Sequence, residues 1–182
     1  MANFDDAVNY VLENEGSYSN NESDKGGETN FGLSFRFLKS IPLENMSNYG
    51  LSYSDDEHLS QLIKDMHIDT AKNVYQGEFW NDHKFSEIEY QNICDYYFDM
   101  AVNHGHAQAT KLVQRSTWAT QAGYRKQIVD DGVFGEKTLS VINGINIFPS
   151  LIAERAGFYR CLVAKDPSQE PNLEGWLNRA YR

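Results

Sequence analysis

Apolar residues recur at helical spacing at the start of the chain. One face of the predicted helix is formed by Phe4, Ala7, Val8, Val11 and Leu12. Extending this face by one turn reaches Glu15, and Gly16 follows where many helices end with a left-handed residue. The pattern therefore predicts a carboxylate at the last turn of a helix, on the side that faces the protein interior.

The stretch after this helix is rich in Asn, Ser and Gly, which are typical of tight turns. Gly26-Gly27 predicts a turn in which φ can be positive, and the run Thr29–Leu33 predicts a small β-hairpin. A hairpin leaving the end of the helix would bring Asp24 and Thr29 back toward Glu15. The sequence thus predicts a polar cluster where the hairpin meets the helix.

This cluster has the composition of a glycosidase site. Glycoside hydrolysis uses two carboxylates that face one cleft, one of them shielded and the other solvated. Burial of Glu15 would favour its neutral form, which can protonate the leaving oxygen. Asp24 would stabilise an oxocarbenium-like state or activate water, and the hydroxyl of Thr29 would hold that water. The alternative is a Glu15 side chain that only extends into solvent past the helix end, because structural carboxylates outnumber catalytic ones.

The same stretch resembles the opening motif of glycoside hydrolase family 108, the N-acetylmuramidases of phages and bacteria. The matching residues are Glu15-Gly16-Ser17-Tyr18 and Asp24-Lys25-Gly26-Gly27-Glu28-Thr29-Asn30-Phe31-Gly32-Leu33-Ser34. The resemblance implies that Glu15 is the catalytic acid. It also implies a mainly α (α+β), lysozyme-like helical fold with a small β-hairpin next to the catalytic Glu. The spacing is similar to the triad of bacteriophage lysozymes, with one residue fewer before the Thr, which implies Asp24 and Thr29 as partners. Ser17 departs from the second Gly of the family motif.

Helical periodicity continues through the rest of the chain. Residues 44–54 read as a loop, and a capping box from Ser54 to Glu57 opens a helix expected to end near Gly77. Apolar spacing predicts further helices over about residues 88–103, 107–120 and 149–164, and one that begins at Gly135.

Several residues outside the predicted triad are candidates for binding a sugar. Phe79-Trp80 resembles an aromatic element of the family, and flat rings stack on sugar faces, although both rings could instead be core anchors. Asn103 closes a second family-like pattern, Phe98 to Gly105, and could bond an acetamido group, position a water or cap its helix. The residues expected to bind substrate are Tyr18, Asn30, Phe31, Trp80 and Asn103.

The second half of the chain resembles peptidoglycan-binding helical modules. The resemblance rests on Leu112-Val113-Gln114, on the run from Asp131 to Thr138, and on Gly175-Trp176-Leu177-Asn178-Arg179, which is similar to the closing element of the family. We therefore expect a lysozyme-like catalytic region over 1–90 and a helical peptidoglycan-binding-like region over 91–182, packed into the same globule.

Composition and charge argue against a nucleic-acid partner and against a membrane-spanning segment. With 182 residues, 41% hydrophobic content and three Trp, the chain can bury a core. A net charge of −10 argues against a nucleic-acid partner, which needs clustered Lys and Arg. No apolar run reaches the roughly 20 residues of a membrane span, and no secretory signal is visible, so synthesis in the cytoplasm is expected.

The thiols and imidazoles do not indicate a cofactor. Cys94 and Cys161 fit no metal-site spacing and are expected to be buried thiols, with one disulfide as the alternative. His104 and His106 are separated by a glycine and have no nearby ligand run, so no metal site is expected.

Taken with the resemblance, these features predict a monomeric peptidoglycan hydrolase that needs no cofactor. Its partner would be the glycan strand, and it would cleave the β-1,4 bond between N-acetylmuramic acid and N-acetylglucosamine with Glu15 as general acid. It would act on the periplasmic cell wall after release or export, as a phage endolysin or a bacterial effector. The alternatives are a lytic transglycosylase that uses Glu15 alone, and a non-catalytic wall-binding or effector module.

Overall fold

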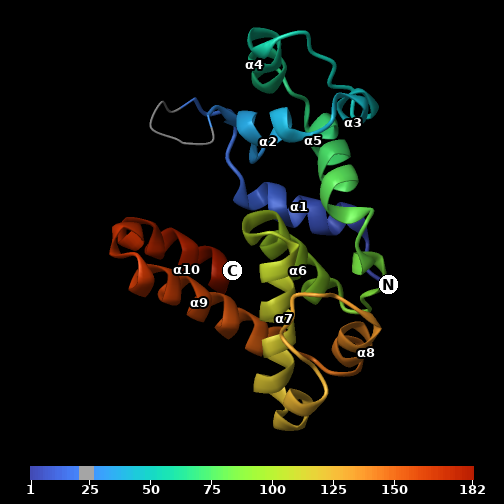
Figure 1. Ribbon diagram of the computed structural model, residues 1–182, viewed down its shortest axis with the longest axis vertical. Coiled ribbons are helices and arrows are strands. Elements are labelled where there is room, and N and C mark those ends of the chain that lie inside the picture. The colour runs from blue at the N-terminus through green and yellow to red at the C-terminus, as the bar shows by residue number, and fades with distance from the viewer. Residues whose placement is uncertain (21–26) are drawn as a thin grey trace. The chain divides into compact units, whose positions relative to one another are not determined.

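The computed structural model describes residues 1–20 and 27–182, and its chain forms two compact units (Figure 1). One unit spans Phe4–His83, and the other combines Met1–Asn3 with Lys84–Arg182. Both are built mainly from helices, and β1 and β2 form a small antiparallel pair, so the predicted fold class is confirmed. The division at residue 90 that the sequence suggests stays a prediction.

The unit Phe4–His83 consists of short elements. In chain order they are α1 (Phe4–Asn14), β1 (Thr29–Asn30), β2 (Leu33–Ser34), α2 (Phe35–Ser40), α3 (Leu43–Asn48), α4 (Asp56–Lys64), α5 (Ile68–Tyr75) and a π-helical turn, η1 (Gln76–Trp80). The predicted face of α1 is confirmed, because Ala7, Val8 and Val11 are fully buried.

The β-hairpin predicted after α1 is also confirmed. Thr29 pairs with Ser34 and Asn30 with Leu33, which leaves Phe31 and Gly32 as a two-residue turn. Both turn residues are left-handed, with φ of 50° for Phe31 and 78° for Gly32. Positive φ at both positions is the geometry of a type I′ turn, whose twist matches that of the two strands.

Two expectations between residues 44 and 77 are wrong. Residues 44–54 are not all loop, because α3 follows Pro42 and completely buries the side chain of Met46. The helix expected from Ser54 to about residue 76 is divided into α4 and α5. His67 interrupts it, because its extended backbone and its ring Nδ1, which accepts the N–H of Asp69, begin a new helix.

The N-cap of α4 is shifted by one residue from the prediction. Asp55, not Ser54, has the extended backbone of an N-cap, and its carboxylate accepts the N–H of His58 at 2.9 Å. The Ser54 hydroxyl instead donates to the Asp55 carboxylate at 2.8 Å. A carboxylate at the N-terminus of a helix also interacts favourably with the helix dipole, so the Asp is the better cap.

The unit that contains residues 84–182 has longer helices. Its elements are η2 (Lys84–Glu87), α6 (Gln91–His104), α7 (His106–Thr120), η3 (Ala122–Lys126), α8 (Glu136–Gly144), α9 (Phe148–Lys165), η4 (Pro167–Asn172) and α10 (Leu173–Tyr181). These confirm the helices that the sequence predicts. Gly105, with φ of 77°, joins α6 to α7.

A buried ion network ties three of these helices together. Asp99 on α6 is fully buried and accepts from Arg155 on α9 and from Arg179 on α10, each at 2.6 Å. The Arg155 guanidinium is fully buried as well and lies 4.9 Å from the ring centroid of Tyr96. Burial next to these arginines lowers the pKa of His104 to about 4, so this imidazole is neutral at pH 7.

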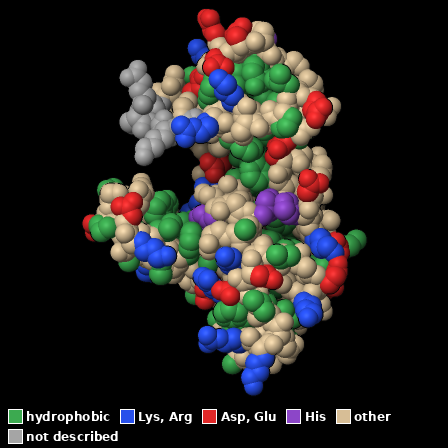
Figure 2. Space-filling model, in the orientation of Figure 1, with side chains coloured by type: hydrophobic (Ala, Val, Ile, Leu, Met, Phe, Trp, Pro, Cys, Tyr) green, Lys and Arg blue, Asp and Glu red, His purple; other side chains and the backbone are tan. Residues whose placement is uncertain are grey.

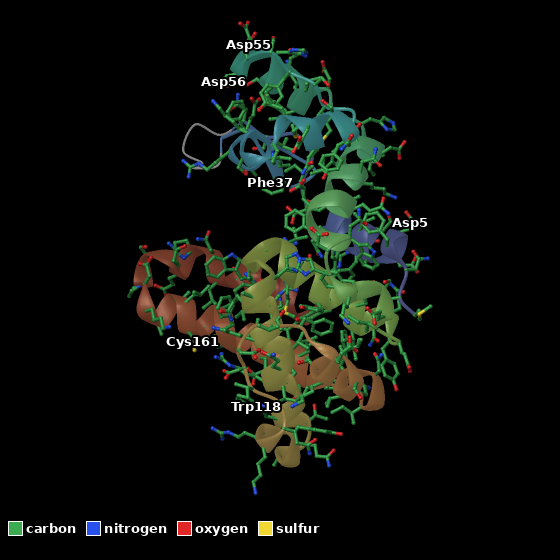
Figure 3. The ribbon with its side chains drawn as sticks, turned by 45° about the vertical axis from the view of Figure 1, so that its right-hand side comes forward. Asp5, Phe37, Asp55, Asp56, Trp118 and Cys161 are labelled. Carbon is green, nitrogen blue, oxygen red and sulfur yellow. The ribbon has the colours of Figure 1, made fainter. Side chains whose placement is uncertain are left out.

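The cysteines differ from the expectation in one respect. Both are free thiols, and Cys94 is buried as expected, but Cys161 is exposed on α9 (Figure 3). The expectation for Cys161 is wrong because the buried face of α9 is formed instead by Leu151, Arg155, Ala156 and Tyr159. Within residues 1–20 and 27–182, no helix is long and apolar enough to cross a bilayer.

Candidate active site

Glu15 lies at the end of α1, one residue past the last helical position. Its N–H donates to the Val11 carbonyl at 3.1 Å, and its side chain is partly buried. The prediction of a left-handed Gly16 is wrong, because its φ is not positive. The chain instead continues toward Ser19, which pairs with Thr29 through backbone hydrogen bonds of 2.8 and 2.9 Å.

The hairpin returns to Glu15 at its turn. A β-carbon placed on Gly32 would lie 2.7 Å from both Cγ and Oε2 of Glu15. Real β-carbons do not approach other atoms so closely, so the carboxyl packs directly on the α-carbon of a glycine. Gly32 therefore has two roles, since it supplies a positive φ for the turn and leaves room for the Glu15 side chain.

Hydrogen bonds from two side chains hold the turn against α4 and α5. The hydroxyl of Tyr75, a fully buried residue of α5, donates to the Phe31 carbonyl at 2.8 Å. The amide of Asn30 donates to the Ile63 carbonyl of α4 at 2.8 Å, and only 5% of Asn30 is exposed. These bonds hold the surface against which Glu15 packs. The role of Asn30 in binding substrate stays a prediction, since its amide is already bonded within the fold.

The sequence did not indicate a role for Glu28, a buried carboxylate that directly precedes the hairpin. Glu28 is 9% exposed and accepts from the hydroxyl of Tyr18 at 2.9 Å and from the hydroxyl of Ser60 on α4. The hydrogen bond to Glu28 raises the pKa of Tyr18. Glu28 thus ties the segment after Glu15 to the hairpin and to α4. Nothing in the local sequence indicates this, because Tyr18 and Ser60 come from distant positions.

Aromatic rings cluster on the same unit. The ring of Phe37 (Figure 3) lies 5.4 Å from that of Phe79, which in turn lies 5.8 Å from that of Tyr75. Trp80 is 8% exposed and packs edge to face on Phe4, with 5.3 Å between centroids. Trp80 is therefore a core anchor, whereas Phe31, Phe37 and Phe79 are partly exposed.

The remaining predicted residues have different surroundings. Thr29 is partly buried in β1. Asp24 lies outside the described residues. Asn103 belongs to the other unit, is exposed near the end of α6, and donates from its amide to the Asp99 carbonyl at 3.0 Å. In the described ranges, no three His, Cys, Asp or Glu side chains form a group that could hold a metal ion.

Two protein families match the sequence of the chain. Residues 8–105 match the family described as Glycosyl hydrolase 108. The chain belongs to glycosyl hydrolase family 108. Residues 108–181 match a second family, described as Predicted Peptidoglycan domain. The resemblance drawn from the sequence is thereby confirmed, and this family 108 protein is a glycosidase that acts on peptidoglycan.

A solved structure shares the fold of this family 108 chain. The protein described as "Structure of Brucella abortus SagA" superposes with a TM-score of 0.60 at 22% sequence identity, over 98% of this chain and 93% of that one. No curated protein matches the chain.

Proposed function

We propose that the protein is an N-acetylmuramidase that cleaves the β-1,4 bond between N-acetylmuramic acid and N-acetylglucosamine, with Glu15 as general acid. The observation that supports this assignment best is the contact between the Glu15 carboxyl and Gly32. A partly buried carboxyl packed on a fixed turn has a defined position, and proton donation to a leaving oxygen requires one.

In this mechanism Glu15 donates its proton to the glycosidic oxygen as the bond to C1 of the muramic acid breaks. Positive charge then develops on C1 and the ring oxygen. Asp24 stabilises this charge or takes a proton from the attacking water, and Thr29 positions that water. The products are a free hydroxyl on one sugar and a reducing muramic acid end on the other.

The replacement Glu15→Gln tests the acid. It keeps the shape of the side chain and removes the proton, so release of fragments from purified peptidoglycan should fall by about 10²- to 10⁴-fold. Glu13→Gln, on an exposed position of α1, is the matched control and should retain activity. Unchanged lysis by the Glu15 variant, with normal thermal unfolding, would exclude Glu15 as the acid.

Glu28 provides an argument for a second candidate, a lytic transglycosylase. Its carboxylate already accepts two hydroxyls and is not available to activate water. A transglycosylase needs a single acid, because a hydroxyl of the muramic acid itself attacks C1. Mass spectrometry separates the two reactions, since the 1,6-anhydro product is lighter by one water than the reducing product. Asp24→Asn should abolish hydrolysis but leave transglycosylation active.

A further inference from the structure

The helical unit Lys84–Arg182 carries a groove between α8 and the segment that follows η3. One part has a volume of about 520 Å³ and the adjoining part about 300 Å³. Gln127, Ile128, Glu136 and Lys137 line both parts, so the two are one continuous groove. All of its residues lie within the stretch that matches the peptidoglycan domain family.

One wall of the groove is held rigidly by α7. Gln114, which is 1% exposed, donates to the Asp131 carboxylate at 2.8 Å and accepts the N–H of Gly132 at 3.0 Å. Trp118 (Figure 3) donates from its indole to the Ile128 carbonyl at 2.9 Å. The wall is therefore preformed, and a ligand would not have to order it.

The charges that line the groove are balanced, two basic against two acidic side chains, whereas the whole chain has an acidic excess. Lys126 and Lys137 line it and are exposed, and neither has a carboxylate partner among the described residues. Of the two acidic lining residues, Glu136 pairs with Lys84, and Asp131 accepts a hydrogen bond from the Gln114 amide. In Figure 2 the Lys and Arg side chains in the lower part of the view are separate from one another, and the chain as a whole has a net charge of −10.

The uncharged lining of the groove combines aliphatic side chains with polar ones such as Gln127 and Ser140. Its aliphatic members are Ile128, Val129, Val133 and Val141, of which Val129 and Val133 are exposed by 68% and 66%. None of the lining residues, all of them described, is aromatic, whereas sugars are commonly bound by stacking on flat rings. Two free ammonium groups and small aliphatic side chains match a short peptide that has methyl side chains and free carboxylates.

We propose that this groove binds the peptide stems of peptidoglycan, with Lys126 and Lys137 pairing with stem carboxylates. The stems are rich in alanine and carry free carboxylates, whereas the N-acetylated glycan backbone is uncharged along its repeats. The proposal rests on peptidoglycan being the substrate, as the proposed function does, but it does not depend on which residue cleaves the bond.

The test is co-sedimentation of the 182-residue chain with purified peptidoglycan sacculi, in the Glu15→Gln background so that the wall stays intact. Adding K126Q/K137Q should weaken binding about fivefold at low ionic strength and less in high salt. The control K64Q/K165Q changes the net charge equally at two exposed lysines outside the groove and should bind as the parent does. Equal binding by both double variants, each with a normal unfolding midpoint, would overturn the proposal.

Two further probes identify the ligand. Amidase digestion separates sacculi into free stems and soluble glycan strands. In a calorimetric titration the stems should bind the parent more tightly than K126Q/K137Q, and the strands should bind both equally weakly. A synthetic stem tetrapeptide should shift the amide NMR signals of residues 126–141, and its C-terminally amidated form should bind more weakly. Tight parental binding to the stem-free glycan strands, with none to the free stems, would contradict the assignment. Retention by sacculi does not report on cleavage, so failure here and failure of the muropeptide assay for Glu15 are distinguishable.

Discussion

The unit Phe4–His83 and the unit that contains residues 84–182 are stabilised in different ways. In the first, short elements are joined by single hydrogen bonds from side chains to backbone carbonyls, such as Asn30 to Ile63 and Tyr75 to Phe31. Both units bury an apolar core, but in the second the long helices also share a buried ion network around Asp99. The candidate acid Glu15 thus belongs to the unit in which single side-chain hydrogen bonds hold the turn beside it. Substitutions at this turn should therefore reduce activity more than they reduce stability.

The largest effect on stability is expected at Asp99. Asp99→Asn keeps the size of the side chain but leaves the charges of Arg155 and Arg179 without their carboxylate, so unfolding should become easier by about 3–5 kcal/mol. Denaturant unfolding measures this loss. Asp130→Asn breaks the partly exposed pair with Arg115 and should lower stability by about 1 kcal/mol at most. A similar small loss for both variants would show that the buried Asp99 network does not stabilise this unit more than an exposed ion pair does.

Gly32→Ala should reduce activity strongly, whereas Asp99→Asn should mainly reduce stability. The new methyl group would collide with the Glu15 carboxyl, and the left-handed backbone disfavours any side chain. Displacing a catalytic group by about 1 Å can reduce the rate about 10²-fold, so muropeptide release should fall by this factor while the chain still folds. Gly16→Ala is the control, because a β-carbon there meets nothing within 4 Å. Full activity of the Gly32 variant would show that its contact with Glu15 does not matter.

The difference between short and long helices also explains which elements could be predicted from the sequence. Helices α6, α7 and α9 follow from apolar spacing, because a long amphipathic face repeats its signal over several turns. Helix α3 and the break at His67 were missed, since six-residue helices contain less than two turns of pattern.

In the candidate site, too, features set by local sequence were predicted and features set by distant contacts were not. The spacing of Glu15 and the hairpin is local, and it was predicted. The roles of Glu28 and Tyr75 depend on contacts with Ser60 and Phe31, which are distant in sequence, so no local pattern could indicate them.

The smallest expected effect concerns the N-cap of α4, where the sequence pointed to the neighbouring residue. Asp55→Ala removes the acceptor for the His58 N–H and should lower the unfolding midpoint by about 3 °C, whereas Ser54→Ala should change it much less. The backbone N–H of His58, helped by the Ser54 hydroxyl, lowers the pKa of Asp55 below its usual 3.8. A carboxylate with a lowered pKa stabilises the fold fully above the unfolded value and loses this effect as the pH falls through the folded one. The difference between the parent and Asp55→Ala should therefore be constant near neutral pH and disappear in strong acid. An equal shift for the two variants, or one that persists in acid, would show that the carboxylate of Asp55 does not cap this helix.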